Sequence, residues 1–323
     1  LDFSSVVVPA ADNLPICSSS EKHLTFRLDG RVFNSLVPLT KEKVLYLDHF
    51  VNIGPFSFAA VCTSTNEIVR IERESSESAA SNLAIPSTLI SLQASVAAPV
   101  TVNDSDSLIV IRKKSAFHVS AITCICKVGA AIFTGDSDGI VANEETEALL
   151  TAHKKSIVCM DGCEALRIIV SVSSDNLVVI SSADDLCFIR SFKIDKLTGK
   201  VEKVVICKGF GIINFLVKFD GLETSKILAY SVNGEFIGVT SLNLNIIQIV
   251  PITCCSNDLD LLAFADDKNR VYVINAFELD EIMLIKEVES QITSLNFFAP
   301  INQQQQLVIG TEMGILHFCY FNL

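Results

Sequence analysis

A short apolar motif recurs along this chain at intervals of about 30 to 50 residues, and that period restricts the fold to an array of similar units. The motif is an isoleucine, a small or polar residue, and then cysteine or serine. Complete or in part, it occurs at Ile90, Ile122, Ile157, Ile252 and Ile292. The wider interval after Ile157 leaves room for another unit near Ile212, and a first unit would use residues 44–47.

Within each unit, a second apolar strand ends in a turn rich in Asp, Asn and Gly, and a third apolar strand follows. These turns lie at Asn66, Asp106, Asp138-Gly139, Asp175-Asn176, Asp267 and Met313-Gly314. Because Asp, Asn and Gly tolerate positive φ and close tight hairpins, each unit is predicted to be an antiparallel meander. The chain is 50% hydrophobic, and its short apolar runs suit strands that are covered on both faces.

Four-stranded meanders bury their faces against neighbouring units, and closing them into a ring protects the free strand edges. The sequence therefore predicts an all-β fold, a seven-bladed β-propeller with four-stranded antiparallel blades. We expect one propeller domain over residues 21–323, after an N-terminal segment over residues 1–20. The hairpin signal Asp29-Gly30, within residues 24–37, is expected to close the ring by adding to the last blade.

Two units resemble the WD repeat in a set of three polar residues: a histidine, then Ser or Thr, then a turn Asp. The sets are His118, Thr134 and Asp138 in one unit, and His153, Ser171 and Asp175 in the next. In the WD family these residues form a buried hydrogen-bonded network within the blade, so the resemblance implies a propeller of WD-repeat type with two such networks. Elsewhere Ala263 and Ile309 replace the hydroxyl and the chain has no Trp, so those blades are expected to rely on packing.

From His153 onward the chain is similar to a narrower family, the C-terminal WD-repeat propeller of BEACH-domain proteins. The similar segments are LTAHKKSIVCMDG, IIVSVSSDNLVVISSADDLCFIRSF, ILAYSVNGEFIG and LVIGTEMGILHF. This resemblance, which covers half of the chain, implies a cytoplasmic scaffold in vesicle and membrane trafficking. An upstream BEACH domain would lie in the same chain, and the propeller would be its protein-interaction module. The alternative is a WD-repeat adaptor of another complex, unrelated to trafficking.

Residue types that could support catalysis occur here in repeated structural positions. His153, Ser171 and Asp175 match a hydrolase triad in type, but the serine lacks the GxSxG elbow that exposes a nucleophile. A propeller enzyme, such as a glycosidase or lyase, would place carboxylates or a metal in the axial funnel. The candidate acids instead lie in turn contexts: Asp136, Asp138, Asp266 and Asp267. We therefore predict no catalytic residue and no cofactor.

The net charge and the cysteines limit which classes of partner and which cellular location the sequence predicts. The net charge of −12, without a dense basic stripe, disfavours nucleic acid and anionic lipid. Residues 78–103 are free of charge but interrupted by polar residues and proline, so no membrane insertion is expected. Eleven cysteines without paired CxxC spacing argue against disulfides and zinc. This cysteine usage predicts a cytoplasmic location, and the resemblance to BEACH proteins implies a place peripheral to endomembranes through the parent protein. Cys124, Cys159 and Cys254 are expected to be apolar fillers near the axis.

Other proteins are the predicted partners, and loops on a rigid scaffold are where recognition concentrates. Four acidic residues in two loops are expected to be exposed: Glu144, Glu145, Asp184 and Asp185. If they form one patch, they would steer a basic segment of a partner in a salt-dependent manner. The alternative is a solvated acidic rim that keeps an apolar protein soluble.

Overall fold

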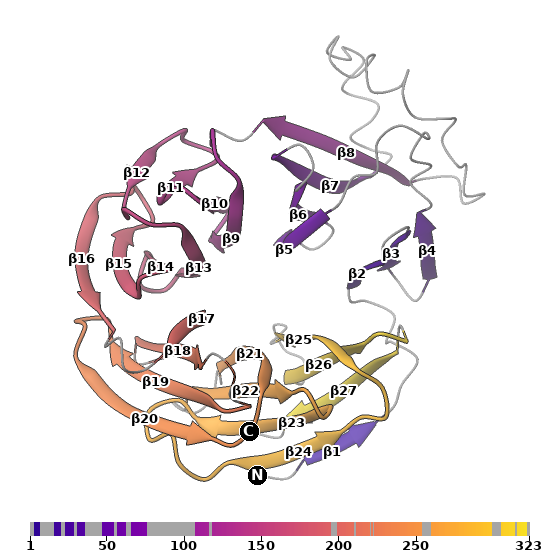
Figure 1. Ribbon diagram of the computed structural model, residues 1–323. Helices are drawn as coiled ribbons and strands as arrows, with labels where there is room; N and C mark the ends of the chain where they lie inside the picture. The colour runs from indigo at the N-terminus through magenta and orange to yellow at the C-terminus, as the bar shows by residue number, and fades with distance from the viewer. Residues whose placement is uncertain are drawn as a thin grey trace.

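Seven antiparallel sheets surround a central axis in the computed structural model (Figure 1). The structure describes the strands within residues 3–75, the strand 107–115, and residues 118–321 apart from 195–198, 210, 220, 222, 254–259, 299–304 and 314. These residues form strands and no helix. Six sheets have four described strands and one has three. The predicted seven-bladed β-propeller is confirmed.

We number the blades in chain order. Blade 1 contains β2 (Ile16–Ser20), β3 (His23–Leu28) and β4 (Arg31–Ser35). Blade 2 contains β5 (Leu47–Gly54), β6 (Ser57–Cys62), β7 (Glu67–Ser75) and β8 (Ser107–Ser115). Blade 3 contains β9 (Ile122–Val128), β10 (Ala131–Asp136), β11 (Ile140–Asn143) and β12 (Leu149–Thr151). Blade 4 contains β13 (Ile157–Cys163), β14 (Ile168–Ser173), β15 (Leu177–Ser182) and β16 (Phe188–Lys193).

The remaining blades follow the same order. Blade 5 contains β17 (Lys200–Cys207), β18 (Ile212–Lys218), β19 (Ser225–Ser231) and β20 (Phe236–Leu242). Blade 6 contains β21 (Ile246–Thr253), β22 (Asp260–Asp266), β23 (Arg270–Asn275) and β24 (Met283–Glu287). Blade 7 contains β25 (Ile292–Phe298), β26 (Gln305–Thr311), β27 (Leu316–Phe321) and, from the other end of the chain, β1 (Phe3–Val6).

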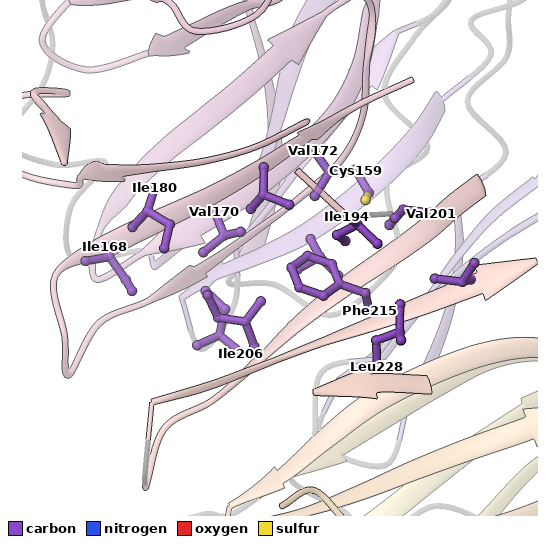
Figure 2. Packing of buried hydrophobic residues seen from close by; sticks show 14 of the residues in the cluster. Cys159, Ile168, Val170, Val172, Ile180, Ile194, Val201, Ile206, Phe215 and Leu228 are labelled. Atoms are coloured by element: carbon purple, nitrogen blue, oxygen red, sulfur yellow. The ribbon is translucent and has the colours of Figure 1, made fainter. Parts of the chain in front are cut away.

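The apolar runs are buried because each blade is covered on both faces by its neighbours. Every residue of β14 is buried. Between blades 4 and 5, Val170 packs in one cluster with Ile206 and Phe215 (Figure 2). Similar clusters lie between blades 3 and 4, 5 and 6, and 6 and 7. The core is therefore a series of interfaces between blades.

Asparagines in the tight turns connect neighbouring blades. The side-chain oxygens of Asn66, Asn176 and Asn269 accept hydrogen bonds from backbone amides of the following blade. The donors are the amides of Ile122, Val201 and Ile292, at 2.8, 3.2 and 3.2 Å. Each bond fixes the start of an innermost strand, so the turn chemistry also sets how the blades join.

The predicted inner strands are correct for some blades and wrong for others. Ile122, Ile157 and Ile292 begin the first strands of their blades. Leu47 begins β5, but this strand belongs to blade 2 and not, as predicted, to the first blade. Ile252 lies near the end of β21, which begins at Ile246. Ile212 begins β18, the second strand; the inner strand β17 was missed because Lys200, Glu202 and Lys203 interrupt its apolar pattern. Ile90 lies outside the described residues.

The ring closes through the N-terminal strand, which the sequence analysis did not assign to a blade. β1 pairs with β27, with Phe3 opposite Phe321. The hairpin in residues 24–37 is present, since β3 and β4 pair with Leu28 opposite Arg31. Its predicted place in the last blade is wrong, because β3 and β4 form a sheet with β2. Residues 1–20 thus contribute strands to two blades, and β1 was missed because four residues are too short to show a strand pattern.

Candidate functional site

The polar residues of blade 3 form a buried chain of hydrogen bonds. His118 Nε2 lies 2.7 Å from Thr134 Oγ1, and His118 Nδ1 lies 2.8 Å from Asp136 Oδ2. The Thr134 hydroxyl donates to Glu144 Oε1 at 2.5 Å. All four side chains belong to residues that are at most 7% exposed. The residue types resemble a catalytic relay, but a substrate has no access to them, so their role is structural.

Asp136, and not the predicted Asp138, is the acid of this network. Asp136 ends β10, and its second carboxylate oxygen accepts hydrogen bonds from the amides of Asp138 and Ile140 at 3.0 and 2.8 Å. Asp138 is exposed and accepts a hydrogen bond from the Ser120 hydroxyl. The prediction chose the carboxylate beside the glycine, whereas the carboxylate at the strand end is the one that points into the blade.

Blade 4 contains only half of the predicted network. His153 Nε2 lies 2.8 Å from Ser171 Oγ, but its Nδ1 has no hydrogen-bond partner among the described residues. Ser173 occupies the strand-end position that Asp136 holds in blade 3. Burial lowers the pKa of His153 to about 4, against a weaker opposing influence of Asp175. His153 is therefore a neutral core histidine with one unsatisfied nitrogen.

Asp175, predicted to be buried and bonded to backbone amides or to His153, is exposed. Its carboxylate accepts a hydrogen bond from the Ser173 hydroxyl at 2.7 Å, and it forms an ion pair with Lys193 Nζ at 3.1 Å. These contacts hold its pKa below the usual range, chiefly through the Ser173 hydroxyl. The predicted structural network of His153, Ser171 and Asp175 is therefore incomplete, and the three side chains do not form the hydrolase triad that their types resemble.

The strand-end position carries an oxygen in four blades, and this is the repeat signal that sequence reasoning missed. The residues are Asp136, Ser173, Asp266 and Thr311. Asp266 accepts from the amides two and four residues later, as Asp136 does, and Arg270 binds its other oxygen at 2.9 and 2.6 Å. Aligning DSDGI, SSDNL, DDKNR and TEMGI shows the pattern: an oxygen-bearing residue first, and Gly or Asn fourth.

Gly139 shows why the fourth position of this turn is restricted. It has a φ of 86°, a conformation that glycine adopts without strain. Its carbonyl accepts a hydrogen bond from His153 N at 3.0 Å, and an added Cβ would overlap the His153 carbonyl oxygen. The turn of blade 3 thereby positions the histidine of blade 4.

No metal site is found in the part of the chain that the structure describes. No group of three or more His, Cys, Asp or Glu side chains there could hold a metal ion. Cys124 and Cys159 are buried and free on the inner strands, and burial raises the pKa of Cys124 to about 12. They have the environment expected of apolar fillers, whereas Cys254 lies outside the described residues. No described helix is long and apolar enough to cross a membrane.

The four acidic residues of the predicted patch have different environments. Glu144 is buried in the blade 3 network, so its predicted exposure is wrong. Glu145 pairs with Arg70 at 3.3 Å, and Asp184 pairs with Arg167. Asp185 is exposed and accepts a hydrogen bond from Cys187 N at 3.1 Å. Because Glu144 is buried, the condition for the proposed steering role, that all four residues share one surface patch, is not met.

Large apolar side chains are exposed on the outermost strands of three consecutive blades, which lie on the circumference in Figure 1. They are Phe188 and Ile189 on β16, Phe236 and Val239 on β20, and Met283 and Leu284 on β24. Phe188 is 58% exposed and Phe236 is 55% exposed. Exposed apolar side chains gathered on one part of a surface indicate an interaction region. Sequence analysis did not distinguish them from the buried apolar strands.

Comparisons with known proteins identify the fold and no family. No family model matches the chain, and no curated protein matches it. One similar solved chain belongs to the crystal structure of BBS1N in complex with ARL6DN, with a TM-score of 0.62 and 12% identity, covering 99% of this chain and 95% of that one. Another belongs to the crystal structure of the Mitotic Checkpoint Complex, with a TM-score of 0.64 and 9% identity, covering 96% of this chain and 85% of that one.

The architecture is shared by many solved proteins, since 1427 chains match it. One fold can host many unrelated functions. The structural likeness therefore supports the β-propeller architecture and does not choose among the functions that propellers perform.

Proposed function

We propose that this chain is a non-catalytic protein-interaction module. The observation that carries the proposal is the exposed apolar surface on the outer strands of blades 4, 5 and 6, which contains Phe188, Phe236 and Leu284. A rigid ring with such a surface suits the binding of other polypeptides. The two similar solved chains come from protein complexes, which is consistent with protein partners here.

The arrangement of polar groups argues against the rival proposal of a propeller enzyme. The His118 network is closed to solvent, and the Asp266 carboxylate is fully buried and paired with Arg270. Both groups are engaged in holding turns. Catalysis would require such groups to face a substrate-sized cavity.

At a finer level, we propose a role like that of the C-terminal propeller of BEACH proteins, in a cytoplasmic scaffold peripheral to endomembranes. Its support is the sequence resemblance from His153 onward. The alternative is a WD-repeat adaptor outside trafficking. Determining the sequence upstream of Leu1 in the full gene product discriminates the two, because a BEACH domain there supports the first and another domain type supports the second.

The module itself is tested by affinity capture with the whole chain as bait and quantitative mass spectrometry. The substitutions Phe188→Lys, Phe236→Lys and Leu284→Lys together should abolish capture of specific partners, because each places a charge on the apolar surface. Val119→Lys is the matched control, since Val119 is 99% exposed and lies outside the outer strands. Thermal melting checks that the triple variant is folded. Absence of any partner that depends on the domain would contradict the proposal.

A further inference from the structure

The outer strand β20 is an unprotected sheet edge. It pairs with β19 on one side, and no described strand pairs with its other side, so a row of backbone donors and acceptors is free to bind another strand. Proteins usually protect such edges with charges, proline or short strands. β20 is seven residues long and has neither a charged residue nor proline.

The other outer strands differ from β20 in these features. β16 contains Arg190 and Lys193, and β24 contains Lys286 and Glu287. β8 contains three basic residues, β4 contains Arg31, and β12 and β1 have only three and four residues. Among the described outer strands, β20 is thus the long one without a protecting charge. On it, Phe236 and Val239 are 55% and 48% exposed.

Gly238, between these two exposed side chains, has no role in the described structure that requires glycine. Its φ is not positive, and a Cβ added there would have Leu279 Cδ1, at 4.0 Å, as its nearest described neighbour. By contrast, added Cβ atoms at Gly135 and Gly162 would overlap neighbouring side chains. Glycine inside a strand weakens it and often marks close approach of another backbone or ligand. The gap beside Gly238 is therefore bounded by Leu279, and no other described atom lies within 4 Å of the added Cβ.

Acidic residues adjoin Leu279 in the sequence. Leu279 lies in the turn before β24 and is buried, while its neighbours Glu278, Asp280 and Glu281 are exposed. None of these three carboxylates forms an ion pair within the described part of the chain. The gap therefore has an apolar floor and a negative border, which complements a basic segment with an apolar side chain at its centre.

We propose that β20 binds an extended basic segment of a partner protein as a fifth strand of blade 5, with an aromatic side chain of that segment over Gly238. Backbone hydrogen bonds along the edge supply affinity, and alternate side chains supply specificity. An aromatic residue opposite a strand glycine covers the exposed backbone. This inference rests on the proposed interaction function and gives it a location and a partner chemistry.

The test uses a fluorescent ten-residue peptide. Threonine and lysine occupy every second position, and the positions between them are valine except for one central phenylalanine. Anisotropy should show saturable binding to the whole chain. Gly238→Val fills the gap and should weaken binding about tenfold, equivalent to about 1.4 kcal/mol, without lowering the melting temperature, because valine favours strands. Ser191→Val on β16, also an exposed position of an outer strand, is the matched control and should bind normally.

Two further measurements separate strand addition from nonspecific apolar contact. Two peptides are compared, one N-methylated at the odd-numbered residues and the other at the even-numbered residues. Their affinities should differ, because only one of the two patterns blocks the amides that face β20. Replacing the peptide phenylalanine with alanine should weaken binding to the native chain and have no further effect on Gly238→Val. Equal binding of both methylated peptides, or additive effects of the two substitutions, would overturn the proposal.

A second copy of the chain is the alternative occupant of this edge, and sedimentation analysis tests for it by measuring the oligomeric state. A dimer that Gly238→Val converts to a monomer would overturn the proposal of a basic partner segment. Failure of the peptide to bind would also overturn it. The interaction module as a whole would survive either result if affinity capture still depended on Phe188 and Leu284, so the two proposals fail separately.

Discussion

Blades 3 and 4 share the first two members of a polar network, a histidine and a hydroxyl residue, but differ in the third. In blade 3 both ring nitrogens of His118 are engaged, by Thr134 and Asp136. In blade 4 His153 has Ser171, but Ser173 replaces the acid and Nδ1 lacks a partner among the described residues. Both histidines remain buried. The blade architecture therefore buries both histidines, whereas the number of hydrogen bonds that each ring makes depends on one strand-end residue.

Removing the acid of blade 3 should have the largest effect. Asp136→Ala would leave His118 and the amides of Asp138 and Ile140 without their acceptor. We expect the free energy of unfolding to fall by about 3 kcal/mol, because unsatisfied buried donors carry their desolvation penalty. Urea denaturation measures the change. Asp138→Ala, two residues away and exposed, is the control and should cost below about 1 kcal/mol; equal costs would refute the assignment of the acid.

Acid should destabilise the protein through His153. The pKa of His153 in the folded protein is about 4, below the ordinary histidine pKa of about 6.5, so the unfolded state binds a proton that the folded state excludes. Stability is then fully present above about pH 6.5 and is lost as pH falls towards about 4, by about 3 kcal/mol in total. Denaturation at pH 7, 5.5 and 4.5 measures the slope. His153→Gln should reduce it, and an unchanged slope in that variant would contradict the role of His153.

The two blades also show how far the sequence predicts the molecule. Turn residues and apolar runs suffice for the propeller fold and for the first strands of blades 3, 4 and 7, because hairpin closure and burial on both faces are local requirements that a sequence displays. They did not suffice for blade 1 or for the inner strands of blades 5 and 6. The site residues are harder to predict from the sequence, because Asp136 and Asp138 are both acids beside the same turn. Which of them is buried depends on where β10 ends, and a strand end is set by pairing with β9 and β11. The exposure of the β20 edge depends on the place of this strand at the outside of its blade, which a local sequence pattern does not display.

Supplying the missing acid should convert blade 4 into a copy of blade 3. Ser173→Asp places a carboxylate where Asp136 lies relative to His118, so it should engage His153 Nδ1 and raise its pKa. We expect a gain of about 1 kcal/mol at neutral pH, with a smaller loss of stability in acid. NMR titration of the imidazole and urea denaturation measure the two effects. Ser173→Asn, which lacks the charge, is the control; a fall in stability with Asp alone would show that the two blades are not equivalent.

The smallest effect is expected at Asp175, the residue that sequence reasoning placed at the centre of the blade 4 network. Its carboxylate is exposed and its ion pair with Lys193 joins side chains that are 42% and 44% exposed. Exposed pairs contribute about 0–1 kcal/mol, since water and salt screen them and ordering the side chains costs entropy. Asp175→Ala should therefore change the free energy of unfolding by below about 1 kcal/mol, and 0.5 M salt should reduce even that difference. Lys193→Ala should match it, because both substitutions remove the same contact. A loss comparable to that of Asp136→Ala would mean that Asp175 reaches His153 in solution, and the distinction between the two blades would then be wrong.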